Sequence, residues 1–152
     1  MPRHELERLF PNLRGSGYSI ESRRNDFYNC IAWAAGVTDD WWWPEDRAYW
    51  PVEPRAPTLA SFIRAFETLG YEPCSTSELE PGYEKVAIYI SEAGLPTHAA
   101  RQLAAGDWTS KLGDMEDIIH RLDGLEGPSP AYGRVEQVLR RPISRTKPAP
   151  HA

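Results

Sequence analysis

The sequence has few of the residues that staple small proteins or hold metals. Its only cysteines are Cys30 and Cys74, too few for a disulfide framework. Neither a CxxC nor an HxxxH spacing occurs, so we expect no metal site and no cofactor. Acidic residues outnumber basic ones, 22 to 17. This balance gives no broad electrostatic attraction to nucleic acid or to an anionic membrane.

Long apolar runs are also missing. No segment has the length needed to cross a bilayer, and the first residues, MPRHELERLF, contain no signal-peptide hydrophobic region. A cytoplasmic protein is the default expectation, and export without a classical signal stays open. None of these patterns sets an oligomeric state.

What is present suits one soluble domain. A chain of 152 residues is long enough to bury a core. We expect a single domain over 1–142 and a disordered tail over 143–152. The 14 prolines predict short elements, and six Trp with seven Tyr require either a core or a binding surface.

Hydrophobic periodicity predicts helices first, then an antiparallel meander, then helices. We expect an α+β domain in which N-terminal helices pack on a small antiparallel sheet. Thr58 is a good N-cap for the helix expected at 58–70. The expected helices are 3–10, 58–70, 114–125 and 132–141, and the expected strands are 71–74, 84–91, 97–103 and 108–113.

The stretch with the most chemistry is 25–36, which reads NDFYNCIAWAAG. If the apolar part is helical, Cys30 lies in the first turn, where free backbone N–H groups and the helix dipole favour a thiolate. Cys30 is therefore a candidate nucleophile. The alternative is a structural thiol packed beside Trp33, because free cysteines are among the most often buried residues.

A tryptophan-rich loop follows at 37–57. Its prolines exclude a regular helix or strand. Trp41, Trp42 and Trp43 either fold back to cover the core or line a substrate cleft.

A helix-initial cysteine, then a strand that begins with histidine, then a strand with a polar side chain resembles the layout of papain-like cysteine peptidases. Within that superfamily the chain is most similar to the NlpC-like branch. Tyr28-Asn29-Cys30 matches its Tyr-Asp-Cys segment, and EKVAIYIS precedes Thr97-His98-Ala99 as its hydrophobic strand precedes the histidine strand. The stretch 97–113 also resembles a group of bacterial domains without an established activity. The usual Ser-Gly after the cysteine is replaced by Ile31-Ala32.

The resemblance implies a Cys30–His98 pair, in which the imidazole takes the thiol proton. It places the third catalytic group in the strand that begins at Trp108. Because side chains alternate along a strand, the choice between Ser110 and Thr109 depends on the register, and we take Ser110 as the expected residue. His120 is read either as a partly exposed helix residue or as a base or orienting group.

The remaining site residues follow from hydrogen-bonding capacity. Lys111 suits an oxyanion or a substrate carboxylate, since its ammonium only donates. Asn25 or Asn29 is a second oxyanion donor beside the Cys30 N–H, and Asn29 is equally a helix cap.

Three functions are consistent with these patterns. The first is a thiol hydrolase or acyl-transfer enzyme (peptidase, deamidase or transglutaminase-like) that acts on an amide bond in a peptide, protein or peptidoglycan-like substrate. The second is a catalytically inactive papain-like binding module, suggested by the bulky Ile31 and the weak third position. The third is a carbohydrate or cell-wall binder that uses the tryptophan-rich loop.

Overall fold

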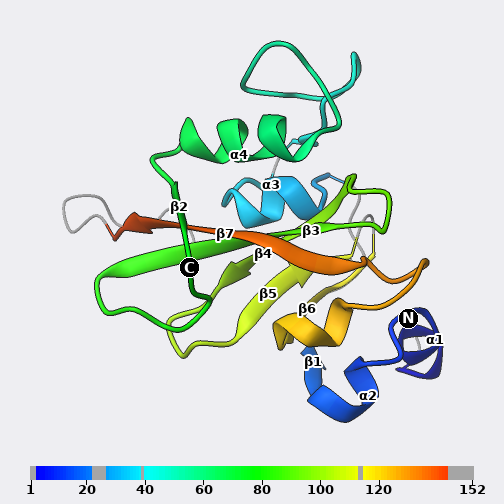
Figure 1. Ribbon diagram of the computed structural model, residues 1–152. Helices are drawn as coiled ribbons and strands as arrows, with labels where there is room; N and C mark the ends of the chain where they lie inside the picture. Colours follow the sequence, from blue (N-terminus) through cyan, green and yellow to red (C-terminus); the bar gives the residue numbers. More distant parts are fainter. Residues whose placement is uncertain (1–2, 22–26, 39, 113–114, 144–152) are drawn as a thin grey trace.

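The computed structural model describes residues 3–21, 27–38, 40–112 and 115–143. A seven-stranded sheet forms its centre, with strand order β1-β6-β5-β4-β3-β7-β2 (Figure 1). Every pair of neighbouring strands is antiparallel. The strands are β1 (Tyr18–Ile20), β2 (Glu72–Cys74), β3 (Tyr83–Ile90), β4 (Pro96–Gln102), β5 (Trp108–Lys111), β6 (Asp117–His120) and β7 (Arg134–Pro142).

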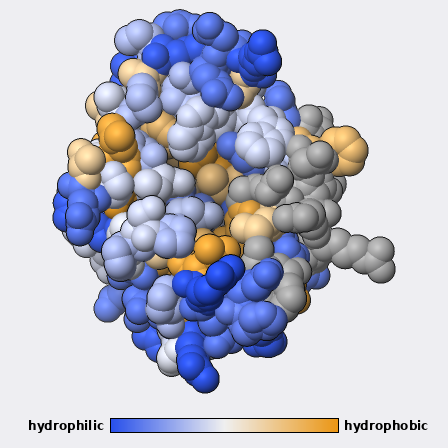
Figure 2. All heavy atoms as spheres, turned by 90° about the vertical axis from the view of Figure 1, so that its right-hand side faces the viewer, coloured by the Kyte–Doolittle hydropathy of each residue, from blue (hydrophilic) through white to orange (hydrophobic). Residues whose placement is uncertain are grey.

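Helices cover both faces of this sheet (Figure 1). On one face, here called the α3 face, lie α3 (Cys30–Ala34) and α4 (Leu59–Glu67). The other, the α1 face, carries α1 (Arg3–Leu9), α2 (Leu13–Ser16) and the 3-10 helix η1 (Leu122–Leu125). On the face shown in Figure 2, hydrophobic residues gather near the centre, with hydrophilic residues above and below them.

Alternation along the central strand divides the core in two. In β3, Val86 and Ile88 belong to the apolar cluster of the α3 face, while Ala87 and Tyr89 belong to that of the α1 face. All four are fully buried. A strand covered on both faces has no polar side, which explains the continuous apolar run.

The α+β class and the antiparallel sheet are confirmed, as are the four expected strands to within two residues at each end. The helix after Thr58 is also confirmed, and the Thr58 hydroxyl accepts the N–H of Ser61. The short edge strand β1 was not among the expected strands.

Two expected helices are wrong. Of the first, the described residues 115–125 form β6 and η1 instead. The second, 132–141, contributes most of β7, which lies between β3 and β2. In β7 the consecutive Val138 and Leu139 are both buried, one on each face. Burial on both faces removes the two-residue period, so apolar spacing alone does not distinguish such a strand from a helix.

Apart from Ile143, the expected tail at 143–152 lies outside the described residues. Within the described ranges, none of the helices combines the length and apolar character that a membrane crossing requires.

Candidate functional site

Cys30 is the first residue of α3, and Asn29 is the N-cap. The Asn29 Oδ1 accepts the N–H of Ala32 at 3.1 Å and that of Trp42 at 3.0 Å, while its Nδ2 donates to the Trp42 carbonyl at 2.8 Å. Asn29 is 3% exposed. Its amide is thus engaged as a helix cap and as a clamp on the loop backbone, rather than as a donor for an oxyanion. Asn25 lies outside the described residues.

The Cys30 thiol lies in the core of the α3 face and is 7% exposed. Burial raises its pKa to about 11, although the backbone N–H groups of Ala99 and Ile31 and the charge of Lys111 act in the opposite direction. The helix start supplies the expected donors. Desolvation outweighs them, since it penalises the charged form of a buried thiol. The thiol is therefore protonated at neutral pH.

His98 does not meet Cys30, which corrects the expected pair. The neighbouring Ala99 faces α3 and belongs to the same cluster as Cys30. Because consecutive side chains of a strand point to opposite faces, His98 points to the α1 face. There its ring stacks on Tyr132, with centroids 4.2 Å apart and an interplanar angle of 9°, and it meets Tyr89 at 5.4 Å.

The His98 imidazole is fully buried, and neither ring nitrogen has a hydrogen-bond partner within the described residues. Burial, with a smaller effect of His120, lowers the pKa of His98 well below its usual value. The ring is therefore neutral, held by stacking.

Ser110 contacts a different histidine from the one expected. Its hydroxyl lies 2.6 Å from Nε2 of His120, whose Nδ1 lies 2.7 Å from the Arg121 carbonyl. A carbonyl only accepts, so Nδ1 carries the proton and Nε2 accepts from Ser110. Burial lowers the pKa of His120 to about 4. This pair was not predicted, because the apolar spacing around His120 indicated a helix. In the structure His120 lies opposite Trp108, which puts it on the same face as Ser110.

Lys111 lies on the α3 face and is fully buried, with Nζ 5.0 Å from the centre of the Tyr28 ring. Thr109, on the same face, accepts the Trp33 indole N–H at 3.0 Å. Asp117 lies opposite Lys111 in the backbone register of β5 and β6, and burial raises the pKa of the Asp117 carboxyl. Asp117 was not among the expected site residues. The α3 face thus gathers a thiol, an ammonium and a carboxyl group.

Within the tryptophan-rich loop the three expected substrate contacts differ. Trp42 is 6% exposed and belongs to the core, and Trp43 packs edge-on against Phe62 with ring centroids 5.3 Å apart. Trp41 is 38% exposed. The loop therefore mainly covers the core, and of the three tryptophans Trp41 is the most exposed.

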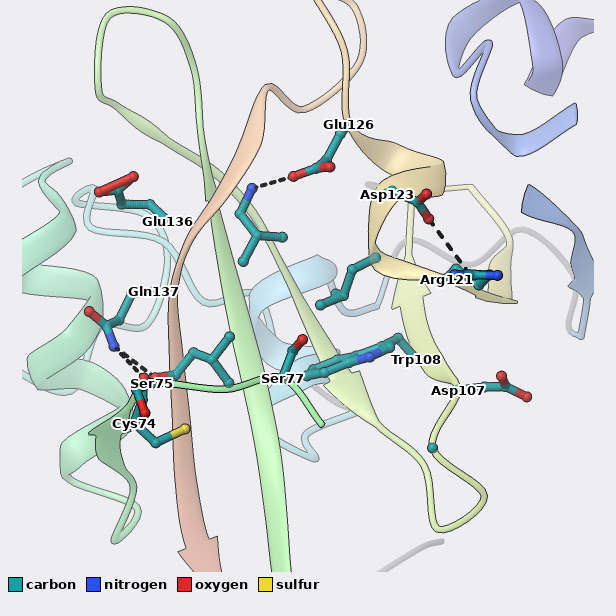
Figure 3. Close-up of a pocket in the computed structure, with 14 residues that line it drawn as sticks. Cys74, Ser75, Ser77, Asp107, Trp108, Arg121, Asp123, Glu126, Glu136 and Gln137 are labelled. Atoms are coloured by element: carbon teal, nitrogen blue, oxygen red, sulfur yellow. Dashed lines mark hydrogen bonds and ion pairs between the residues drawn. The ribbon is translucent and has the colours of Figure 1, made fainter. Parts of the chain in front are cut away.

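A hollow of about 830 Å³ opens on the α1 side of the sheet (Figure 3). Its boundary consists of residues 74, 75, 77, 106–108, 121–123, 126 and 135–138. Leu122, Val135 and Val138 supply apolar contacts. In Figure 3, polar side chains from the η1 segment, the β4–β5 turn and β7 surround the space.

Metal-ligating side chains do not cluster: the described residues contain no group of three or more His, Cys, Asp or Glu that would hold an ion.

Short helices on both faces of a seven-stranded antiparallel sheet define an α+β domain. Residues 19–140 match the model of the family described as domain of unknown function DUF7689, and the chain belongs to this family. No curated protein and no solved structure matches the chain.

Proposed function

We propose that the chain is a papain-like binding module whose partner enters the hollow on the α1 side. The hollow itself carries the proposal: at about 830 Å³ it falls within the range of ligand sites. It combines apolar contacts with polar side chains from several elements (Figure 3). The papain-like layout is supported by a helix that begins with cysteine and packs on an antiparallel sheet.

The position of the thiol also favours binding over catalysis. A nucleophile and its base must come within hydrogen-bond reach. Cys30 is packed in the α3-face core, whereas His98 and His120 point to the other face. In this arrangement the thiol contributes to packing.

Chemical-shift mapping tests the binding function. Basic, neutral and acidic heptapeptides are added in turn to ¹⁵N-labelled protein. At least one peptide class should shift the amides that line the hollow, and Cys30→Ala should respond in the same way. Ser77→Trp fills the hollow from an exposed position and should abolish the response. Ala60→Trp, exposed on α4, is the control. No response at the hollow from any class would reject the proposal.

A second candidate is the thiol hydrolase or acyl-transfer enzyme, with Lys111 in place of His98 as the charge beside Cys30. The observation in its favour is that Lys111 and the backbone N–H groups of Ala99, Ile31 and Cys30 lower the pKa of the thiol, against the larger effect of burial. Iodoacetamide labelling across pH tests it. Rapid modification of Cys30 near neutral pH, abolished by Cys30→Ala, would favour the enzyme over the binding module.

A further inference from the structure

We infer that the hollow binds an uncharged peptide segment of a partner protein. In this arrangement a backbone carbonyl of the peptide accepts the indole N–H of Trp108, and an aliphatic side chain of the peptide packs on Leu122 and Val135. All three residues line the hollow. The inference rests on the proposed binding function and specifies the chemistry of the partner.

The Trp108 indole is a hydrogen-bond donor without an acceptor. Trp108 begins β5, is 4% exposed and lines the hollow, where Figure 3 shows its ring between Ser77 and the η1 segment. Its N–H has no hydrogen-bond acceptor among the described residues. The nitrogen is also not one of the fully enclosed polar atoms that lack a partner there. The donor of this nearly buried side chain therefore reaches the hollow.

Two other tryptophans show how the fold satisfies the same donor elsewhere. The Trp33 indole N–H donates to the Thr109 hydroxyl at 3.0 Å, and that of Trp50 donates to the Ser61 hydroxyl at 3.0 Å. A buried indole usually finds such a partner, and a donor left without one is costly. An acceptor on a ligand in the hollow would remove that cost at Trp108.

The charges around the hollow decide which acceptor fits. A carboxylate or phosphate on the ligand would be repelled, because four acidic side chains and a single guanidinium surround the space. A neutral carbonyl accepts an N–H without that penalty. The charged residues are Asp107, Asp123, Glu126, Glu136 and Arg121.

The apolar part of the hollow favours a peptide over a sugar. Leu122 and Val135 are half-buried, and an aliphatic side chain would remove their accessible surface from water. A sugar ring would need an open aromatic face. Trp108, the one aromatic residue in the described lining, is too enclosed to offer its face. At about 830 Å³ the space holds several residues of a peptide.

Indole ¹H–¹⁵N spectra test the inference. The probe is Gly-Ser-Gly-Leu-Gly-Ser-Gly with acetylated and amidated ends, added to the ¹⁵N-labelled full chain. The Trp108 indole proton should move downfield as the peptide saturates, since a new hydrogen bond deshields it. The indole protons of Trp33 and Trp50 are the controls and should stay in place, because both are already hydrogen-bonded and pack on the α3 face.

Fluorescence anisotropy with the labelled peptide measures the affinity. Trp108→Phe keeps an aromatic ring, removes the N–H and should weaken binding at least about fivefold. Trp50→Phe makes the same change on the α3 face and should alter the affinity less than about twofold. A peptide with Ala in place of Leu should bind at least about fivefold more weakly to the parent chain. If Trp108→Phe does not fold, the indole shift of the parent chain decides.

A Trp108 indole proton that stays in place while the peptide shifts the hollow amides would overturn the inference and leave the binding function standing. Equal affinity for the Leu and Ala peptides, or tighter binding of an acidic peptide, would overturn it in the same way. A β-1,4-linked glucose tetrasaccharide that moves the Trp108 proton when no peptide does would reject a peptide partner. If no peptide class shifts the hollow amides, both proposals fail.

Discussion

The two faces of the sheet bury ionisable groups in different ways. On the α3 face, backbone N–H groups and Lys111 surround the Cys30 thiol. On the α1 face, Ser110 and His120 form a hydrogen-bonded pair, while His98 is held by stacking on Tyr132. The α3 face provides hydrogen bonds to the Cys30 thiol. The α1 face leaves the His98 imidazole without any from the described residues.

This difference shows that a shift of one position along a strand decides which face of the sheet a side chain points to. Ala99 contacts the thiol side and His98 the opposite side, because successive side chains alternate. A one-residue change of register would exchange them. The four predictions below test whether each face is held as described, from the largest expected effect to the smallest.

The largest effect is expected at Gly133, next to the Tyr132 that stacks on His98. An added Cβ would lie 1.9 Å from the Ile90 carbonyl oxygen, and the residue has φ +86°. Gly133→Ala should cost about 4 kcal/mol in the free energy of unfolding, at the upper end for single substitutions. Urea denaturation measures it.

Gly94→Ala is the matched control for this change. Gly94 has a similar φ of +82°, but nothing lies within 4 Å of the added Cβ. It should cost only the backbone strain, about 1–2 kcal/mol. Equal losses at both positions would show that the added Cβ of the Gly133 variant does not clash with the Ile90 carbonyl, and that the chain beside Tyr132 is less closely packed than described.

On the α3 face, the corresponding test is Asn29→Ala. It removes the cap of α3 and both hydrogen bonds to the Trp42 backbone. We expect a loss of about 2–3 kcal/mol, from about 1 kcal/mol for the cap and the rest from buried unpaired groups at Trp42. Denaturant unfolding measures it.

Asn29→Ser separates the two roles of this residue. Its hydroxyl retains a capping oxygen for the Ala32 N–H but does not reach both Trp42 groups. An intermediate loss is expected. A loss as large as that of Asn29→Ala would show that the clamp on the loop, and not the cap, carries the stability.

The local features of the α3 face were predictable from sequence. The helix start at Cys30, the cap at Asn29 and the cap at Thr58 all follow from short-range hydrogen-bonding preferences, and the structure contains them. The strand at 84–91 was predictable because its apolar run is long and rich in β-branched residues.

What was missed depends on contacts distant in sequence. The face to which His98 points follows from the pairing of Tyr89 with His98, next to a register shift between Tyr89 and Ile90. The pairing of Ser110 with His120 required 117–120 to be a strand beside β5. Local spacing carried no information on either pairing, so the resemblance supplied a histidine partner that the fold does not bring to the thiol.

The third prediction concerns the protonation of Cys30. Burial raises its pKa from 9.0 to about 11, so above pH 9 the unfolded chain loses this proton while the folded chain keeps it. Stability must then fall as pH rises. Between pH 9 and 10 we expect a loss of about 1 kcal/mol from this group. Urea unfolding at several pH values measures it.

Cys30→Ala should remove this part of the pH dependence, whatever its effect on stability at neutral pH. Cys74→Ser is the control and should keep the dependence of the parent chain, since Cys74 is only half-buried. An unchanged slope in Cys30→Ala would mean that the thiol is not desolvated in solution and would return it to the candidates for a nucleophile.

The smallest change at neutral pH, and the only one expected to stabilise, is His98→Phe. Phenylalanine keeps the stack on Tyr132 and removes two buried nitrogens that lack partners in the described residues. An apolar ring that needs no hydrogen-bond partners should stabilise the fold by about 1 kcal/mol at pH 7. The advantage should grow on acidification. The pKa of folded His98 is well below 6.5, so the unfolded chain alone gains the proton as pH falls below that value, and the parent chain loses stability that the variant keeps. Unfolding at pH 7 and pH 5 measures both effects, with His98→Ala as the variant that loses the stack. If Phe destabilises as much as Ala, the imidazole nitrogens have partners in solution, and the contrast between the two faces does not hold.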